Sequence, residues 1–84
     1  MLYNSIEVKM TNKAELNNLI KFYKTYKTRP TTDDAVSNKL IILNNFLEQI
    51  IAKSKELNID SSEFEIEKQN IKKELNKYNI NLAD

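Results

Sequence analysis

Residues 36–57 read VSNKLIILNNFLEQIIAKSKEL, a stretch with the spacing of an amphipathic helix. The residues of its inward stripe follow one another at alternating spacings of four and three residues. They are Val36, Leu40, Leu43, Leu47, Ile50, Ser54 and Leu57. At ~100° per residue the stripe widens to about half of the helix circumference through Ala35, Ile42, Phe46 and Ile51. We therefore predict a helix over 33–57 whose stripe serves two neighbouring helices.

The opposite face of this helix is polar and contains Asn44 and Glu48, with Ile41 and Ala52 as its only apolar members. A three-helix core has little room for apolar side chains outside its main stripes. We therefore expect part of the surplus to form a patch that meets another chain. The surplus residues are Leu2, Tyr3, Phe22, Ile41, Ile80 and Leu82.

A helix over 12–27 is predicted before this stretch. Asn12 and Glu15 have the spacing of a capping box, and an apolar face follows through Leu16, Leu19, Ile20, Tyr23 and Tyr26. Pro30 disfavours helical geometry at the residue before it, so the helix is expected to stop near its predicted end.

A third helix is predicted over 61–78. Asn58 suits the left-handed position that ends the preceding helix when no glycine is present. Asp60 with Glu63 makes the equivalent of a capping box, and the Asn-Ile ending recurs at 79–80. The inward side chains of this helix are expected to be Phe64, Ile71, Leu75 and Tyr78.

Residues 5–10 alternate apolar and polar side chains, the period of a half-buried strand. We expect an extended or strand-like arm over 1–10, which as a strand would pair with another chain; the alternative is that these residues join the following helix. Residues 33–78 share one heptad phase, so a single rod is the alternative to a hairpin. The expected fold is all-α: one domain over 1–84, with the arm followed by a small three-helix bundle over 11–84.

The chain of 84 residues contains no glycine, histidine, cysteine or tryptophan. It therefore has no imidazole base, no thiolate, no zinc site of the usual nitrogen and sulfur ligands, and no glycine loop that cradles phosphate. We expect no enzymatic activity, no cofactor and no metal. The formal net charge is +1, and no apolar run approaches the ~18 residues that span a bilayer, so a cytoplasmic protein without membrane contact is expected.

The segment 21–29 is basic and aromatic, and no acid occurs between residues 16 and 32. Lysines supply phosphate affinity and aromatic rings stack on bases, so nucleic-acid contact is one hypothesis. The simpler interpretation places the tyrosines in the core and the lysines on a solvated face. The candidate residues for binding a partner or nucleic acid are Lys13, Lys21, Phe22, Lys24, Lys27, Arg29 and Ile41.

These features predict a small non-catalytic helical protein that binds another macromolecule, in the first place a protein. Size and composition favour a phage- or plasmid-type inhibitor or adaptor that acts on a protein or nucleoprotein enzyme. A homodimer or coiled coil through residues 33–57 is a further hypothesis.

A strand followed by two helices, over residues 6–51, resembles a ribbon-helix-helix DNA-binding protein. The resemblance implies a dimer whose paired strands enter the major groove, with Ser5, Glu7 and Lys9 facing outward. The chain departs from that family at Glu7, which would repel phosphates, and in a longer connection that lacks glycine. A dimeric DNA-binding regulator is kept as the alternative function.

Overall fold

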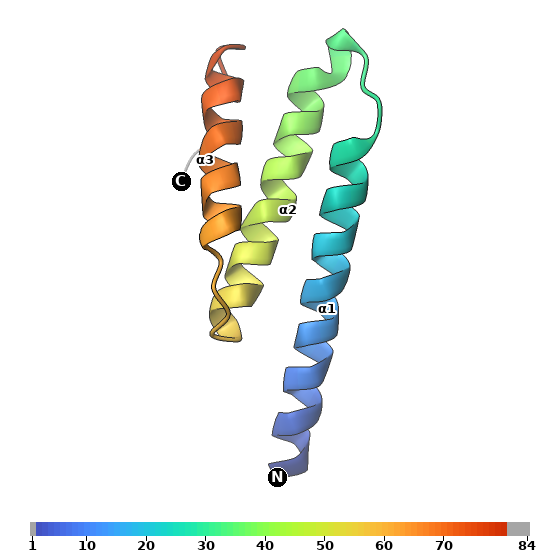
Figure 1. Ribbon diagram of the computed structural model, residues 1–84, viewed down its shortest axis with the longest axis vertical. Coiled ribbons are helices and arrows are strands. Elements are labelled where there is room, and N and C mark those ends of the chain that lie inside the picture. Colours follow the sequence, from blue (N-terminus) through green and yellow to red (C-terminus); the bar gives the residue numbers. More distant parts are fainter. Residues whose placement is uncertain (1, 81–84) are drawn as a thin grey trace.

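A computed structural model describes residues 2–80, with side chains from residue 12 onward. Three helices lie side by side (Figure 1), and they are α1 (Leu2–Thr28), α2 (Val36–Glu56) and α3 (Ser62–Asn76). A short 3-10 helix, η1 (Asp33–Ala35), precedes α2. The predicted three-helix bundle is confirmed, and the hairpin of α2 and α3 excludes the single rod.

The expected N-terminal arm is wrong wherever the structure describes it, because α1 already begins at Leu2. Neither glycine nor proline interrupts residues 2–28, and a helix gives backbone amides partners that a lone strand lacks. Asn12 is therefore no helix cap: it lies inside α1, where its side-chain oxygen accepts a hydrogen bond from Lys53 Nζ at 3.4 Å. The ribbon-helix-helix alternative loses the strand that it requires.

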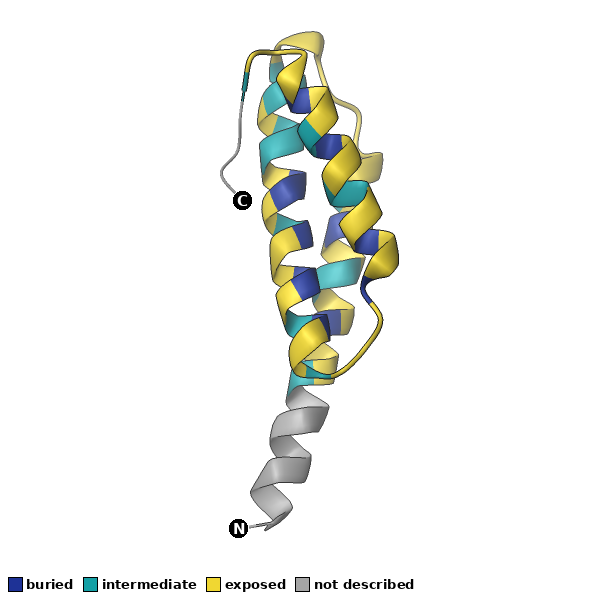
Figure 2. Cartoon of the chain, turned by 90° about the vertical axis from the view of Figure 1, so that its left-hand side faces the viewer, coloured by how far each residue is buried: buried dark blue, intermediate teal, exposed yellow. Residues whose placement is uncertain are grey.

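α2 is the central helix and packs against both α1 and α3. Its stripe forms the core as predicted, since Leu47 and Ile50 are fully buried. The buried residues lie on the inward faces of the three helices (Figure 2). The flanking helices contribute Leu16, Tyr23, Phe64, Ile71 and Leu75. Most of the α2 stripe is thus covered within one chain, and Ile42 is its exposed member.

One side of α2 is covered more fully than its pattern predicts. The pattern places Asn44 and Ile41 on the polar face, but Asn44 is 3% exposed and Ile41 packs, partly buried, against the core. On the same side Glu48 forms an ion pair with Lys68 of α3, at 3.5 Å. The spacing of residues 41, 44 and 48 puts them on one face, so α3 reaches further around α2 than the stripe alone indicates.

α2 ends in a Schellman motif built on asparagine instead of glycine. Asn58 has a φ of 57°. Its N–H donates to the Lys55 carbonyl at 3.2 Å, and the Ile59 N–H donates to the Ser54 carbonyl at 2.8 Å. Asn79 ends α3 with the same two bonds and a φ of 61°, so both predicted Asn-Ile endings are confirmed.

Ser61 is the cap residue of α3 and makes no side-chain capping bond, so the start of the helix is stabilised by the side chain before it, that of Asp60. Its Oδ1 accepts hydrogen bonds from the Ser62 backbone N–H at 3.0 Å and from the Ser62 hydroxyl. These two bonds hold the pKa of the Asp60 carboxyl below its usual range. The Glu63 side chain makes no hydrogen bond to a described residue, and Asp60 accepts from the Ser62 N–H instead of the Glu63 N–H, so the predicted capping box does not form.

We expect Asn58→Ala to lower the free energy of unfolding by about 1 kcal/mol, because a Cβ without a compensating polar group is disfavoured in the left-handed region. Asn58→Gly is the matched control and should equal or exceed the wild type. Urea denaturation measures both. Equal stability of the alanine variant and the wild type would contradict the assigned role.

We expect Asp60→Ala to be less stable than the wild type at neutral pH, because the ionised acceptor of the two Ser62 hydrogen bonds is lost. The pKa of this carboxyl is lower in the folded state than its ordinary 3.8. The stabilisation is therefore complete above that value and disappears as the pH falls through the folded pKa. Thermal unfolding of the wild type and of Asp60→Ala should show a difference in midpoint at pH 7 that disappears toward pH 2. The control Asp60→Asn keeps an acceptor, so its midpoint at pH 7 should stay close to that of the wild type.

Candidate protein-binding surface

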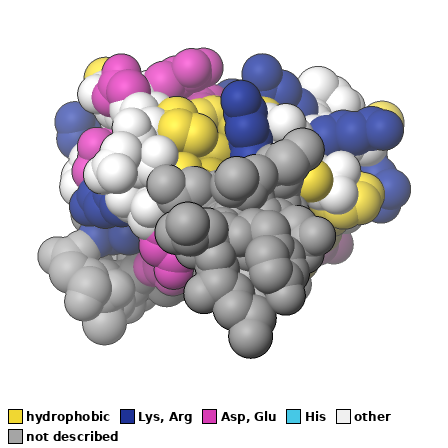
Figure 3. Space-filling view, turned by 90° about the horizontal axis from the view of Figure 1, so that it is seen from below, with side chains coloured by type: hydrophobic (Ala, Val, Ile, Leu, Met, Phe, Trp, Pro, Cys, Tyr) yellow, Lys and Arg dark blue, Asp and Glu magenta, His cyan; other side chains and the backbone are white. Residues whose placement is uncertain are grey.

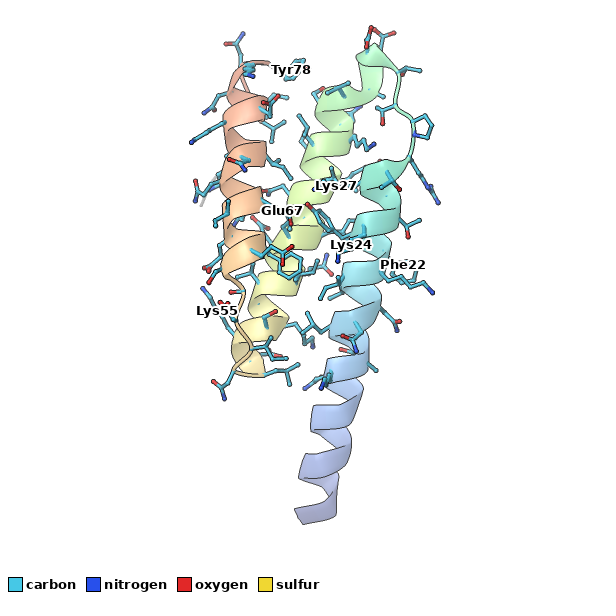
Figure 4. All side chains as sticks on the ribbon, in the orientation of Figure 1. Phe22, Lys24, Lys27, Lys55, Glu67 and Tyr78 are labelled. Carbon is cyan, nitrogen blue, oxygen red and sulfur yellow. The ribbon has the colours of Figure 1, made fainter. Side chains whose placement is uncertain are left out.

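α1 carries every candidate residue except Arg29, which follows it, and Ile41 of α2, but it spreads them around its circumference. Successive residues of a helix are ~100° apart, so residues 21–29 cannot present one face. Lys24 and Lys27 point toward the space between α1 and α3, whereas Phe22 points away from α3 (Figure 4). Exposed positions elsewhere on α1 and just after it are those of Lys13, Lys21 and Arg29.

Lys27 is engaged within the protein. Its Nζ lies 2.6 Å from Glu67 Oε1 of α3 and 5.7 Å from the centroid of the Tyr23 ring. The ion pair is partly exposed, so it contributes about 0–1 kcal/mol to stability. Seen from below, the surface shows both signs of charge around small apolar areas (Figure 3). Because Lys27 is paired with Glu67, it does not add a free positive charge to the basic segment.

Tyr23 belongs to the core. It is 2% exposed, and its ring meets Phe64 edge-on with centroids 6.5 Å apart. Its hydroxyl has no hydrogen-bond partner among the described residues. Burial, and then the nearby carboxylates of Glu67 and Glu63, raise the pKa of this hydroxyl. The ring is thus not free to stack on a base.

A second pair of rings joins α1 to α2. The centroids of Tyr26 and Phe46 are 6.3 Å apart, and both side chains are partly buried. Phe22 lies one turn before Tyr26 and Ile42 one turn before Phe46, and their exposed fractions are 58% and 40%. We name these four side chains the α1–α2 apolar face.

The surroundings of this face are nearly free of charge. Side chains three and four residues away share a helix face: around Phe22 they are Asn18, Leu19, Thr25 and Tyr26, and around Ile42 they are Asn38, Lys39, Asn45 and Phe46. Lys39 is the only charged one, in a chain that is 30% charged. Ile66 is more exposed, at 63%, but it stands beside Glu63 on α3 without an apolar neighbour at these spacings.

The sequence pattern selects Phe22 correctly as an exposed apolar residue and Ile41 wrongly. Ile42, assigned to the stripe, is the exposed one of the two isoleucines. Because α3 lies over the side of α2 that carries Ile41, the two positions exchange roles. The sequence indicates that one apolar side chain is in excess at positions 41 and 42. Only the position of α3 shows which of the two isoleucines is exposed.

Comparisons with protein-family models, with curated proteins and with solved structures find no match. None of the described helices is both long and apolar enough to cross a membrane. Among the described residues no group of three or more acidic, histidine or cysteine side chains is arranged to hold a metal ion. The functional argument accordingly depends on the surface geometry of this chain.

We expect Tyr23→Phe to raise the free energy of unfolding by about 1 kcal/mol, because it removes a buried hydroxyl without a partner. The ordinary tyrosine pKa is 10.0, and burial raises it in the folded state. The wild type should therefore lose stability as the pH rises above that value, and the variant should lose less. Urea denaturation at pH 7 and pH 10.5 measures both effects; a loss of 1 kcal/mol or more at pH 7 would show that the hydroxyl is bonded.

Proposed function

We propose that the protein is a non-catalytic protein-binding module and that its contact surface is the α1–α2 apolar face. The observation that carries this proposal is the position of Phe22, Tyr26, Phe46 and Ile42 side by side on two helices joined by the Tyr26–Phe46 contact, with few charged neighbours. Depletion of charge around exposed aromatic side chains is characteristic of the centre of protein interfaces.

The free energy available from burying this apolar face fits a binding function. Single exposed apolar residues are common on protein surfaces, and Ile59, Ile66 and Tyr78 are of that kind. A half-exposed phenylalanine next to a second ring is different, because it contributes about 25 cal/mol for each Å² of apolar area that a partner removes from water. Aromatic side chains of this type are typical anchors of interfaces.

An inhibitor or adaptor fits this chemistry, since such a protein acts by covering a partner's surface and needs no reactive group. The helices hold the face on a rigid support without any ligand. The phage or plasmid origin and the cytoplasmic location stay predictions.

Nucleic-acid contact through residues 21–29 also stays a prediction, with less support. Phe22 is the only ring of the segment left exposed, because Tyr23 is buried and Tyr26 already lies under two cations. Lys27 is paired with Glu67. The remaining lysines lack an aromatic platform of the kind that single strands use.

The test is affinity capture from a lysate of the cells that encode the protein, with nuclease added. We expect the wild type to retain one protein in a stoichiometric amount, and the variant Phe22→Ser with Ile42→Ser to lose it. Both positions are exposed, so circular dichroism should show unchanged helicity.

Ile66→Ser is the matched control, because it removes an equally apolar and more exposed side chain from another helix. It should capture the same protein as the wild type. Equal capture by all variants would contradict the proposed face, and a capture that disappears with nuclease would favour the nucleic-acid hypothesis instead.

A further inference from the structure

Two cations meet at one end of the α1–α2 apolar face. The Arg29 guanidinium carbon lies 5.9 Å from the centroid of the Tyr26 ring, and Lys39 Nζ lies 6.0 Å from the same centroid. Lys39 Nζ also donates a hydrogen bond to the Arg29 carbonyl at 2.5 Å. Lys39 is one turn before Ile42 on α2, so these charges adjoin the apolar face directly.

Neither cation is neutralised within the described part of the chain. Arg29 and Lys39 make no ion pair with any described carboxylate, although other lysines do: Lys27, Lys53, Lys55, Lys68 and Lys77. Asp33 and Asp34 are the nearest acids along the chain, but they are exposed and pair with neither cation. The Lys39 bond to the end of α1 uses one donor of its ammonium group and leaves the others for a ligand.

The two side chains border a hollow of ≈ 340 Å³ between the α1–η1 connection and the start of α2. Its other polar lining comes from the hydroxyls of Thr31 and Thr32 and the amide of Asn38. The Thr31 hydroxyl already donates to the Arg29 carbonyl at 3.3 Å, whereas the Thr32 hydroxyl, the Asn38 amide and both cations can donate to a ligand. Two positive charges beside such donors suit a carboxylate.

We propose that the partner of the α1–α2 apolar face is an acidic amphipathic helix. Its apolar stripe covers Phe22 and Ile42, and a carboxylate one or two turns further along enters the hollow beside Arg29 and Lys39. This inference rests on the proposed function and specifies its partner. Charge complementarity carries it: at this end the face is bordered by two adjacent cations without carboxylate partners, whereas the charges near Leu19 at the other end, Glu15, Lys53 and Glu56, are paired with one another.

A protein helix matches this arrangement better than a nucleic acid does. The cations sit beside an apolar surface, whereas a phosphate backbone would need further positive charge along the face. The Tyr26 ring is covered by the cations and offers no platform for a base.

The test is a selection from a displayed library of short amphipathic helices with randomised polar positions. The wild-type protein should enrich helices with two apolar residues four apart and Asp or Glu beyond one end of that pair. The variant Arg29→Gln with Lys39→Gln should enrich the same apolar pair without the acids.

Affinities of the selected acidic peptides quantify the effect. They should fall roughly 3- to 10-fold at low salt in the double variant, and the loss should shrink as salt rises. The control Lys21→Gln with Lys24→Gln removes two exposed charges of α1 away from the hollow and should bind like the wild type. Arg29→Gln alone, which leaves the Lys39 bond intact, should show part of the loss, and circular dichroism checks the helicity of each variant.

The outcomes separate the two proposals. Apolar enrichment without acids, lost in Phe22→Ser with Ile42→Ser, would overturn the acidic partner and keep the apolar face. Enrichment that survives the Phe22 and Ile42 changes, or no enrichment at all, would overturn both.

Discussion

The wide apolar stripe of α2 has to be covered from two sides, and the other features of the protein follow from that constraint. A stripe of about half the circumference is too wide for one neighbouring helix. α1 and α3 therefore both pack on α2, and they place the fully buried Leu47, Ile50 and Leu75 between them. Burial of this kind is the main favourable contribution to stability in a domain of this size.

The chain contains no glycine, so the endings of α2 and α3 place another residue in the left-handed region. α2 and α3 both end at an asparagine with positive φ, and in each case the following isoleucine donates its N–H back to the last turn. Asparagine tolerates this backbone region better than other residues with a side chain. Together with the hydrogen bonds from Ser62 to Asp60, the Asn58 ending turns the chain within a few residues, and this converts a continuous heptad phase into a hairpin.

The same constraint shapes the surface. Because α1 contacts α2 with one flank and α3 with another, its three neighbouring rings have three different environments. Tyr23 is directed toward Phe64 of α3, Tyr26 toward Phe46 of α2, and Phe22 stays exposed beside them. An apolar face with two cations at its end results from this division, and it is the feature that most favours a binding function.

The sequence by itself determined the number of helices, most of the inward side chains and the two asparagine endings, because these depend on periodicity and on local backbone preferences. On α3 the prediction that Tyr78 lies inward is wrong: the helix ends at Asn76, and Tyr78 beyond it is 47% exposed. It did not determine the conformation of residues 5–10, where a short alternation of apolar and polar residues is compatible with a strand and with a helix. Only the tertiary structure decided which of Ile41 and Ile42 is exposed, and that Asn44 is buried, since both depend on how far α3 reaches around α2. The approach of Arg29 and Lys39 to one ring was likewise beyond sequence reasoning, because it joins the end of α1 to the first turn of α2 across a connection whose path no local pattern specifies.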